Sequence, residues 1–324
     1  MAEVRREGEP VFAEASLAVP TTLPRDLDSI AVSRENGYVT LAKLNADILY
    51  IYKWQNSGNS QQPRVQLAWF KWKFNNPLRY QCIINDQLFI LDTDNFLQHV
   101  NLKQVTTDPS IDKDGINYLL HLDNYTTVAS GTYDAATKKT TFANQSDWID
   151  DVTTPNGDLV VVDSDSNTAR VGRYAKCTVF NTDDFTVPGD WSSATLNIGY
   201  LYDYQVDLPK IYVTKQTGQS SWSHDTQSSL TIHRIQLNLG KSGLYETTLT
   251  RVGKADYTEV YESTDLDEYD ASDAPYLEET TRNIPVYEKN TNVKIKIKST
   301  HPAPAVLKSM AWEGNYSPKF YRRQ

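Results

Sequence analysis

Apolar and polar residues alternate one by one in several stretches of this chain. In QLAWFKWKF, residues 66–74, Phe70 and Trp72 fall on one side of an extended chain, and Lys71 and Lys73 fall on the other. A period of two residues is typical of a β-strand with one apolar face and one solvated face. The alternation therefore predicts a strand here.

Two hairpin turns are predicted in the residues that follow this strand. The pairs Asn85-Asp86 and Asp94-Asn95 each interrupt an apolar run, and these residue types suit the tight turn of a hairpin. The stretch 48–102 is therefore predicted to be a meander of short antiparallel strands without a helix.

The same unit occurs twice in this part of the chain. Residues 30–54 and 82–103 each contain three short apolar runs separated by turn residues, at an offset of about fifty residues. That offset is the period of propeller blades, although any antiparallel meander would look similar. We expect either two propeller-like blades or a generic sheet, with QLAWFKWKF as the outer fourth strand of the first blade. No outer strand directly follows Lys103.

The rest of the chain is also predicted to be β-structure. β-Branched residues and Tyr alternate with turn residues at a spacing of eight to twelve residues, and no long amphipathic helix occurs. We expect an all-β protein with an extended arm at 1–27, propeller-like blades at 28–104, an inserted antiparallel sandwich or barrel at 105–205 and a C-terminal β-domain at 206–324. The arm is either a frayed terminus or a strap onto a neighbouring subunit.

The charge balance argues against a protein that grips nucleic acid through its phosphates. The formal net charge is −9, whereas phosphate binding needs a basic surface. Ten carboxylates and no Lys or Arg lie between Asp256 and Glu279. This acidic run is either a solubilising loop or the lining of a passage that repels DNA. For the second role the candidate channel-lining residues are Asp265, Asp267, Glu268, Asp270 and Asp273.

Two groups of residues are candidates for protein contacts. Lys294, Lys296 and Lys298 form a row on one face of a predicted strand, where they either protect a sheet edge or contact an acidic neighbour. Trp69 and Trp72 are the aromatic candidates, since large aromatic side chains anchor protein interfaces well.

No constellation for catalysis, cofactor binding or metal binding is recognisable. Ser223, His224 and Asp225 are adjacent, but neighbours on one strand point to opposite faces. Neither paired histidines nor phosphate-binding glycine loops occur, and the oxygen-rich run from Asp163 to Asn167 lacks the glycine and the glutamate of a calcium loop. The two cysteines are expected to be buried free thiols. We therefore expect no enzyme, no cofactor and no metal.

Several motifs resemble one known family in the same order. These are YIYKW at 50–54, WFKW at 69–72, SGTYD at 130–134, IHRIQLNLGKSGLY at 232–245 and WEGNY at 312–316. Together they resemble the tail nozzle protein of short-tailed bacteriophages, also called tail tubular protein B. The similarity runs from about residue 40 to the end of the chain.

The resemblance implies a structural virion protein of the phage tail, assembled in the host cytoplasm. It implies a homohexameric ring of propeller-based subunits that joins a tail adaptor ring (tail tubular protein A-like), supports tail fibres and surrounds DNA during genome ejection. Family members are about twice as long, so either this is part of a longer nozzle chain or a second chain supplies the missing blades. The alternative function is a carbohydrate-binding tail module that contacts the host surface.

Overall fold

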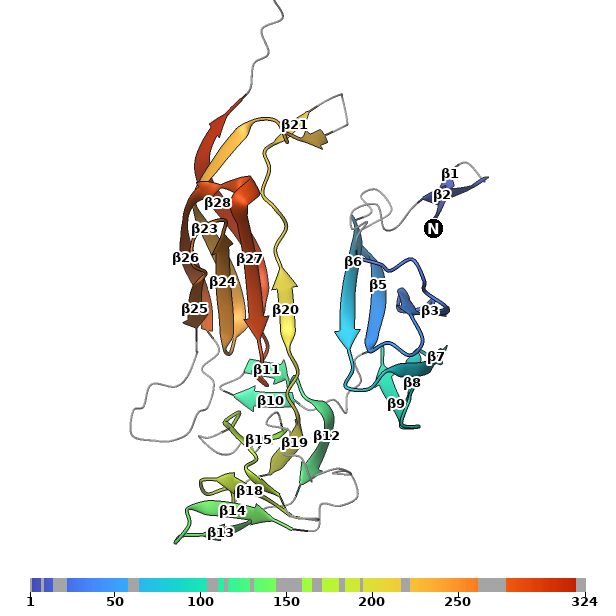
Figure 1. Ribbon diagram of the computed structural model, residues 1–324. Coiled ribbons are helices and arrows are strands. Elements are labelled where there is room, and N and C mark those ends of the chain that lie inside the picture. Colours follow the sequence, from blue (N-terminus) through green and yellow to red (C-terminus); the bar gives the residue numbers. More distant parts are fainter. Residues whose placement is uncertain are drawn as a thin grey trace, which may run out of the picture. The chain divides into compact units, whose positions relative to one another are not determined.

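The computed structural model of the protein describes residues 2–6, 9–13, 22–57, 64–103, 110–113, 116–128, 131–143, 159–164, 171–180, 184–192, 195–216, 222–261 and 278–318 (Figure 1). Apart from the single 3-10 turn η1 (Asn290–Asn292), every regular element in these residues is a β-strand, so the prediction of an all-β protein is confirmed. The chain divides into two compact units, which we call unit 1 (residues 1–107) and unit 2 (residues 108–324).

Unit 1 contains a four-stranded and a three-stranded antiparallel sheet. The first sheet has the order β3 (Ser29–Ser33), β4 (Tyr38–Ala42), β5 (Ile48–Ser57) and β6 (Arg64–Lys73). The second sheet has the order β7 (Leu78–Ile84), β8 (Gln87–Asp92) and β9 (Leu97–Asn101). A separate hairpin joins β1 (Ala2–Arg6) and β2 (Glu9–Ala13). The predicted meander is confirmed, and β6 is the outer fourth strand.

The turns of the second sheet follow from their residue types. Asn85 and Asp86 have φ angles of 50° and 61°, and they close a two-residue hairpin between Ile84 and Gln87. Positive φ at both central residues defines the hairpin turn that suits the twist of the flanking strands, and Asn and Asp tolerate it well. Asn95 is also left-handed, with a φ of 66°. Both predicted turns are therefore present.

The two sheets of unit 1 pack against each other through one apolar face each. Leu49 and Ile51 of β5 are fully buried in this core, together with Leu88 and Ile90 of β8. Burial of each such side chain contributes roughly 1.5–3 kcal/mol. Among the described residues neither sheet closes into a ring. Unit 1 thus has two open antiparallel sheets, and their identity as propeller blades stays a prediction.

Unit 2 begins with a hairpin and a two-sheet sandwich. The hairpin joins β10 (Ser110–Lys113) and β11 (Ile116–Leu119). One sheet of the sandwich has the order β12 (Asp123–Val128), β19 (Leu196–Tyr200), β15 (Leu159–Asp163) and β16 (Tyr174–Lys176). The other has the order β13 (Thr132–Asp134), β14 (Lys139–Phe142), β18 (Phe185–Pro188) and β17 (Val179–Phe180). Phe142 and Phe185 are paired on neighbouring strands of this second sheet, and their rings stack with 4.9 Å between centroids in the core between the two sheets. The two sheets are both open and share one apolar core.

A second sandwich forms the C-terminal part of unit 2. Its larger sheet has the order β20 (Tyr204–Asp207), β27 (Val293–Ser299), β24 (Tyr245–Arg251) and β25 (Tyr257–Tyr261). The facing sheet has the order β26 (Glu278–Lys289), β23 (Ser229–Ser242) and β28 (Leu307–Ser317). A short hairpin joins β21 (Thr214–Gln216) and β22 (Trp222–His224). The long strands in Figure 1 run side by side in two layers around one apolar core.

The C-terminal sandwich has one apolar and one polar face on its three-stranded sheet. Ile235, Leu237 and Leu239 of β23 are buried in the core. On the opposite side Asn238 donates a hydrogen bond to Ser309 Oγ at 2.8 Å and accepts one from Thr281 Oγ1 at 3.1 Å. This sheet therefore exposes a hydrogen-bonded polar surface to solvent, as antiparallel sheets commonly do.

The two sandwiches of unit 2 meet in a small core of their own. Strand β15 is buried at every position, with Leu159 and Val161 facing the first sandwich core and Val160 and Val162 facing the junction. Ala303, from the loop after β27, packs into the same junction. The backbone N–H of His121 donates to the Pro302 carbonyl at 2.8 Å. The two sandwiches of this unit are thus joined by both apolar packing and a backbone hydrogen bond.

Candidate contact surfaces

The face of the first sheet that points away from the unit 1 core carries several apolar side chains, with Lys71 and Lys73 at its β6 side. Strand register places Val32 beside Val39 and Ile30 beside Leu41, and extends the first row to Tyr52 and Trp69. We call these six residues the outer face of the first sheet. Ile30 is 66% exposed and Val32 is 47% exposed. Large aliphatic side chains therefore lie open on this face.

The second sheet shows the same property. Register aligns Tyr80 with Leu91 and Leu97, and Cys82 with Phe89, on the side opposite the unit 1 core. With Ile84, these residues form what we call the outer face of the second sheet. Tyr80, Ile84 and Leu97 are 57%, 54% and 66% exposed.

Sheets with large exposed apolar side chains on the outer face differ from the usual solvated antiparallel sheet. Strands that are covered on both sides read as apolar at most positions, whereas a solvated face is polar. Contiguous exposed apolar patches mark interaction sites in soluble proteins. The two outer faces of unit 1 are therefore its candidate contact surfaces.

The two tryptophans predicted as interface residues lie on opposite faces of β6. Trp69 is half-buried on the outer face of the first sheet, with its ring 4.8 Å from that of Tyr52. Trp72 packs against the core of unit 1, as do Phe70 and Phe74. The structure does not bring Trp69 and Trp72 together, and only Trp69 belongs to a candidate contact surface.

The predicted lysine row is present on β27, but the strand is not a sheet edge. Lys294 and Lys296 are exposed, and Ile295 and Ile297 between them are buried. Strand β27 lies between β20 and β24, so the expectation of edge protection is wrong. It failed because both pairing partners come from distant parts of the chain.

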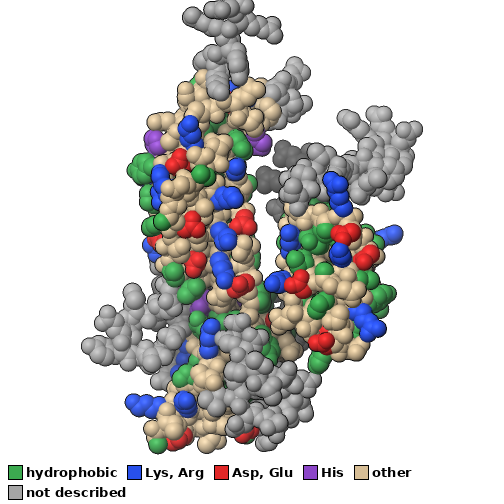
Figure 2. Space-filling view, viewed as in Figure 1, with side chains coloured by type: hydrophobic (Ala, Val, Ile, Leu, Met, Phe, Trp, Pro, Cys, Tyr) green, Lys and Arg blue, Asp and Glu red, His purple; other side chains and the backbone are tan. Residues whose placement is uncertain are grey.

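Part of the lysine row has an acidic partner within unit 2. Lys298 forms a salt bridge of 3.0 Å with Asp203, and within the described residues no such bridge involves Lys294 or Lys296. In Figure 2 blue and red side chains are interspersed along this part of the molecule. The face is therefore mixed in charge, with two lysines available for an external acidic group.

The predicted channel-lining residues lie outside the described residues. Asp265, Asp267, Glu268, Asp270 and Asp273 all belong to the segment 262–277, which connects β25 to β26. Their proposed role stays a prediction.

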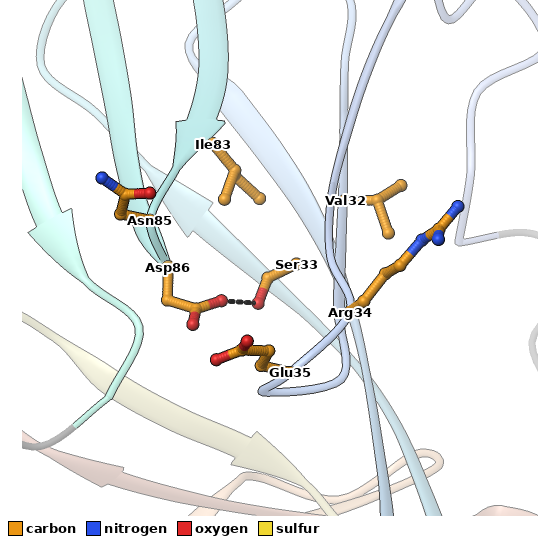
Figure 3. Close-up of a pocket in the computed structure, with 7 residues that line it drawn as sticks. All are labelled: Val32, Ser33, Arg34, Glu35, Ile83, Asn85 and Asp86. Carbon is orange, nitrogen blue, oxygen red and sulfur yellow. Dashed lines mark hydrogen bonds between the residues drawn. The ribbon is translucent and has the colours of Figure 1, made fainter.

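A shallow hollow on unit 1 lies beside the turns that precede β4 and β8. Its lining includes Val32, Ser33, Glu35, Ile83 and Asp86. Ser33 Oγ donates a hydrogen bond to Asp86 Oδ1, and this bond is the main cause that lowers the pKa of Asp86 below its usual value. Figure 3 shows Arg34 extending away from the Asp86 carboxylate. The Ser33–Asp86 hydrogen bond therefore links the turn that precedes β4 to the turn that precedes β8.

The carboxylate of the sequence run Ser223-His224-Asp225 has a structural role. Asp225 accepts hydrogen bonds from the Ser228 and Tyr316 hydroxyls, each at 2.5 Å, and Lys215 Nζ lies 2.5 Å away. The bond from Lys215 is the largest of the interactions that hold the pKa of Asp225 far below its usual value. Asp225 thus ties the β21–β22 hairpin to β28.

The start of the oxygen-rich run also has a protein partner. Asp163 is buried beside the Arg173 guanidinium, with 3.6 Å between Oδ2 and Nε. Arg173 in turn lies 3.9 Å from the Trp191 ring and donates to the Asp190 carbonyl. The rest of the run, residues 165–167, lies outside the described residues.

Within the described residues no three His, Cys, Asp or Glu side chains gather as metal ligands would. Of the two free cysteines, Cys177 is buried and Cys82 is half-buried. Burial raises the pKa of the Cys177 thiol well above its usual range. No helix in the described part of the chain is long and apolar enough to cross a membrane.

Two histidines at the junction of unit 2, the buried His301 and the half-buried His121, were not predicted as functional residues. His301 is 6% exposed, and burial lowers its pKa to about 4, with a smaller contribution from His121. Its Nδ1 accepts a hydrogen bond from the Ala303 N–H at 2.9 Å, and its ring meets that of Tyr174 edge-on at 4.7 Å. Gly243 lies so close that a Cβ there would be 2.7 Å from Nδ1. An isolated histidine gives no sequence signal for such a site.

A comparison with known protein families identifies the family of this chain. The family of bacteriophage nozzle proteins matches residues 6–323, which is nearly the whole chain. The chain belongs to the bacteriophage nozzle protein family. The resemblance drawn from the sequence motifs is thereby confirmed, and the protein is a structural component of a phage tail. No curated protein matches the sequence.

Proposed function

We propose that this nozzle protein is a wall subunit of a homohexameric ring at the distal end of the phage DNA channel. The observation that supports the proposal is the set of large exposed apolar side chains on the outer faces of both sheets in unit 1. A wall module needs such faces because it is covered on two sides by its neighbours.

Further blade-like sheets cover these faces in the proposed assembly. The packing between the two sheets of unit 1 is the example, since it buries Leu49 and Ile51 against Leu88 and Ile90. A third sheet against Ile30 and Val32, and a fourth against Tyr80 and Ile84, would extend the same stack toward a propeller. The extra sheets come from another stretch of a longer nozzle chain or from a second chain.

The channel function is proposed for the acidic segment 262–277. Six carboxylates and no basic residue in this segment would repel DNA, so that the polyanion passes without adhering. Screening limits the repulsion to about 8 Å at physiological salt. Asp265, Asp267, Glu268, Asp270 and Asp273 therefore act only if they line a narrow part of the channel.

The ring joins a tail adaptor ring on one side and supports tail fibres during genome ejection. Trp69 and the exposed lysines Lys294 and Lys296 are the proposed contacts to neighbouring subunits. The role is passive and requires no catalytic step. Assembly takes place in the host cytoplasm before release of the virion.

The ring is tested by the mass of the assembled particle. The chain is mixed with the adaptor ring and examined by native mass spectrometry. A complex that contains six copies supports the proposal, and a chain that stays monomeric beside an intact adaptor ring contradicts it.

The channel role is tested separately by ejection. Tails that carry Asn at the four Asp positions 265, 267, 270 and 273 and Gln at Glu268 should release DNA more slowly. An unchanged release rate would place the acidic segment outside the channel without affecting the evidence for a ring.

A further inference from the structure

The outer edge of β9 differs from the equivalent edge of the first sheet. Both sheets of unit 1 start with the same three antiparallel strands, since β3, β4 and β5 correspond to β7, β8 and β9. The first sheet then adds β6, which pairs along the whole of β5. In the described residues β9 has no strand beyond it. Its outer backbone N–H and C=O groups are a template for another strand.

The side chains around β9 lack the cover that β6 provides in the first sheet. On the face that packs against the unit 1 core, Gln98 of β9 pairs with Ile90 of β8, as Ile51 of β5 pairs with Thr40 of β4, so Gln98 is the equivalent of Ile51. Ile51 is fully buried opposite Phe70, whereas Gln98 is exposed, and Leu97 on the outer face is 66% exposed. Phe96, directly before β9, is 52% exposed. Two large apolar side chains are thus open beside an unpaired strand edge.

The chain directly after β9 is too short to supply the missing strand. In the first sheet a hairpin leads from Ser57 to Arg64 and returns as ten residues of β6. After Lys103 only residues 104–109 precede Ser110, where β10 begins and pairs with β11. A two-residue turn and a five-residue strand alone would need about seven residues.

We propose that β9 binds an extended strand of a separate polypeptide by antiparallel β-strand addition. Such addition uses main-chain hydrogen bonds for affinity and side-chain contacts for specificity. The first sheet indicates the side chains that the partner carries, because Trp72 lies opposite Leu49 and Phe70 lies opposite Ile51. The partner strand therefore has bulky apolar residues two positions apart, opposite Gln98 and Val100, which are the β9 positions that face the core. This inference is independent of the ring and its channel.

A peptide with the sequence QLAWFKWKF, that of residues 66–74, serves as the probe. Amide hydrogen exchange of the full-length chain is measured with and without the peptide. We expect exchange of the β9 amides that face away from β8 to slow at least tenfold at saturation. A peptide of the same composition with aromatic residues and lysines exchanged in position is the control, since it places the aromatic rings on the wrong face.

Matched variants separate strand addition from general apolar adhesion. Leu97→Lys and Ile30→Lys alter residues that are equally exposed, each at 66%, at β9 and at the opposite edge strand β3. We expect Leu97→Lys to weaken peptide binding at least tenfold and Ile30→Lys to leave it within twofold.

Three results would overturn the proposal. These are the absence of peptide binding at 100-fold excess over protein, an equal loss of binding in both variants, and β9 amides that are already protected in the chain alone. The last result would mean that a segment of this chain already occupies the edge.

Discussion

Unit 1 and the C-terminal sandwich of unit 2 are both built from two antiparallel sheets, but the side chains on their outer faces differ in polarity. The sandwich buries Leu237 and Leu249 in its core and shows Gln236 and Asn238 to solvent. Unit 1 buries Leu49 in the same way, yet it also leaves large apolar side chains open on both outer faces. The three-stranded sheet of the sandwich therefore has a polar row on its outer face, whereas the outer faces of unit 1 carry the apolar side chains on which the proposed contacts rest.

The largest expected effect comes from a core substitution in the sandwich. Leu237→Ala removes a fully buried side chain, and such truncations lower the free energy of unfolding by about 2–5 kcal/mol. Chemical denaturation followed by segment-resolved hydrogen exchange measures the loss. Gln236→Ala, on the solvated face of the same strand, should cost less than about 1 kcal/mol. Equal losses would mean that the two faces are not different.

Acidification should lower the free energy of unfolding of unit 2 more than that of unit 1. His301 has its pKa lowered to about 4 by burial, so the unfolded chain binds a proton at a higher pH than the folded chain does. Neutral His301 therefore contributes its full share to the free energy of unfolding above pH 6.5. This contribution falls by about 3 kcal/mol as the pH is lowered toward 4. Burial also lowers the pKa of His121, which adds to the same loss. The only histidine of unit 1, His99, is exposed.

Hydrogen exchange across this pH range measures the difference between the units. His301→Asn is the control, because its side-chain oxygen can accept the Ala303 hydrogen bond but cannot titrate. The acid loss in unit 2 should shrink in this variant. A loss of the same size would assign the effect to other groups.

Polar substitutions on the outer face of the first sheet should change association more than stability. Ile30→Thr with Val32→Thr removes exposed apolar surface, so we expect less than about 1 kcal/mol of change in unfolding free energy. We expect assembly into tails to fall at least tenfold. Thr281→Ala, on the solvated face of the sandwich, is the matched control for assembly. Equal assembly of both variants would contradict the contact role of unit 1.

The smallest effect is expected on the lysine row. Lys296→Gln removes an exposed charge from β27, and surface changes of this kind usually alter stability by less than about 0.5 kcal/mol. A thermal unfolding curve checks this. A large loss would mean that Lys296 has a partner within the fold.

Local patterns predicted much of the fold. The alternation in residues 66–74 gave the faces of β6 correctly, and Asn85-Asp86 indicated a hairpin turn whose geometry the structure shows. Such features depend on neighbouring residues alone. The position of β27 inside its sheet depends on β20 and β24, which lie far away in the sequence, so the lysine row was wrongly expected at an edge.

The contact surfaces were only partly predictable. Trp69 was expected at an interface and lies on an outer face, but the same argument also selected Trp72, which packs inward. A strand pattern shows that two faces exist without showing which one the second sheet covers. The site of His301 depends on Gly243 and Tyr174, and no short motif joins these three residues.

The most direct test compares side-chain accessibility in the free chain and in assembled tails by hydroxyl-radical footprinting. If unit 1 is covered by neighbours, Ile30, Val32, Tyr80 and Ile84 lose most of their reactivity in the tail, while Pro285 and Tyr287 on the three-stranded sheet of unit 2 serve as the comparison. Unchanged reactivity of the four unit 1 residues would contradict the account.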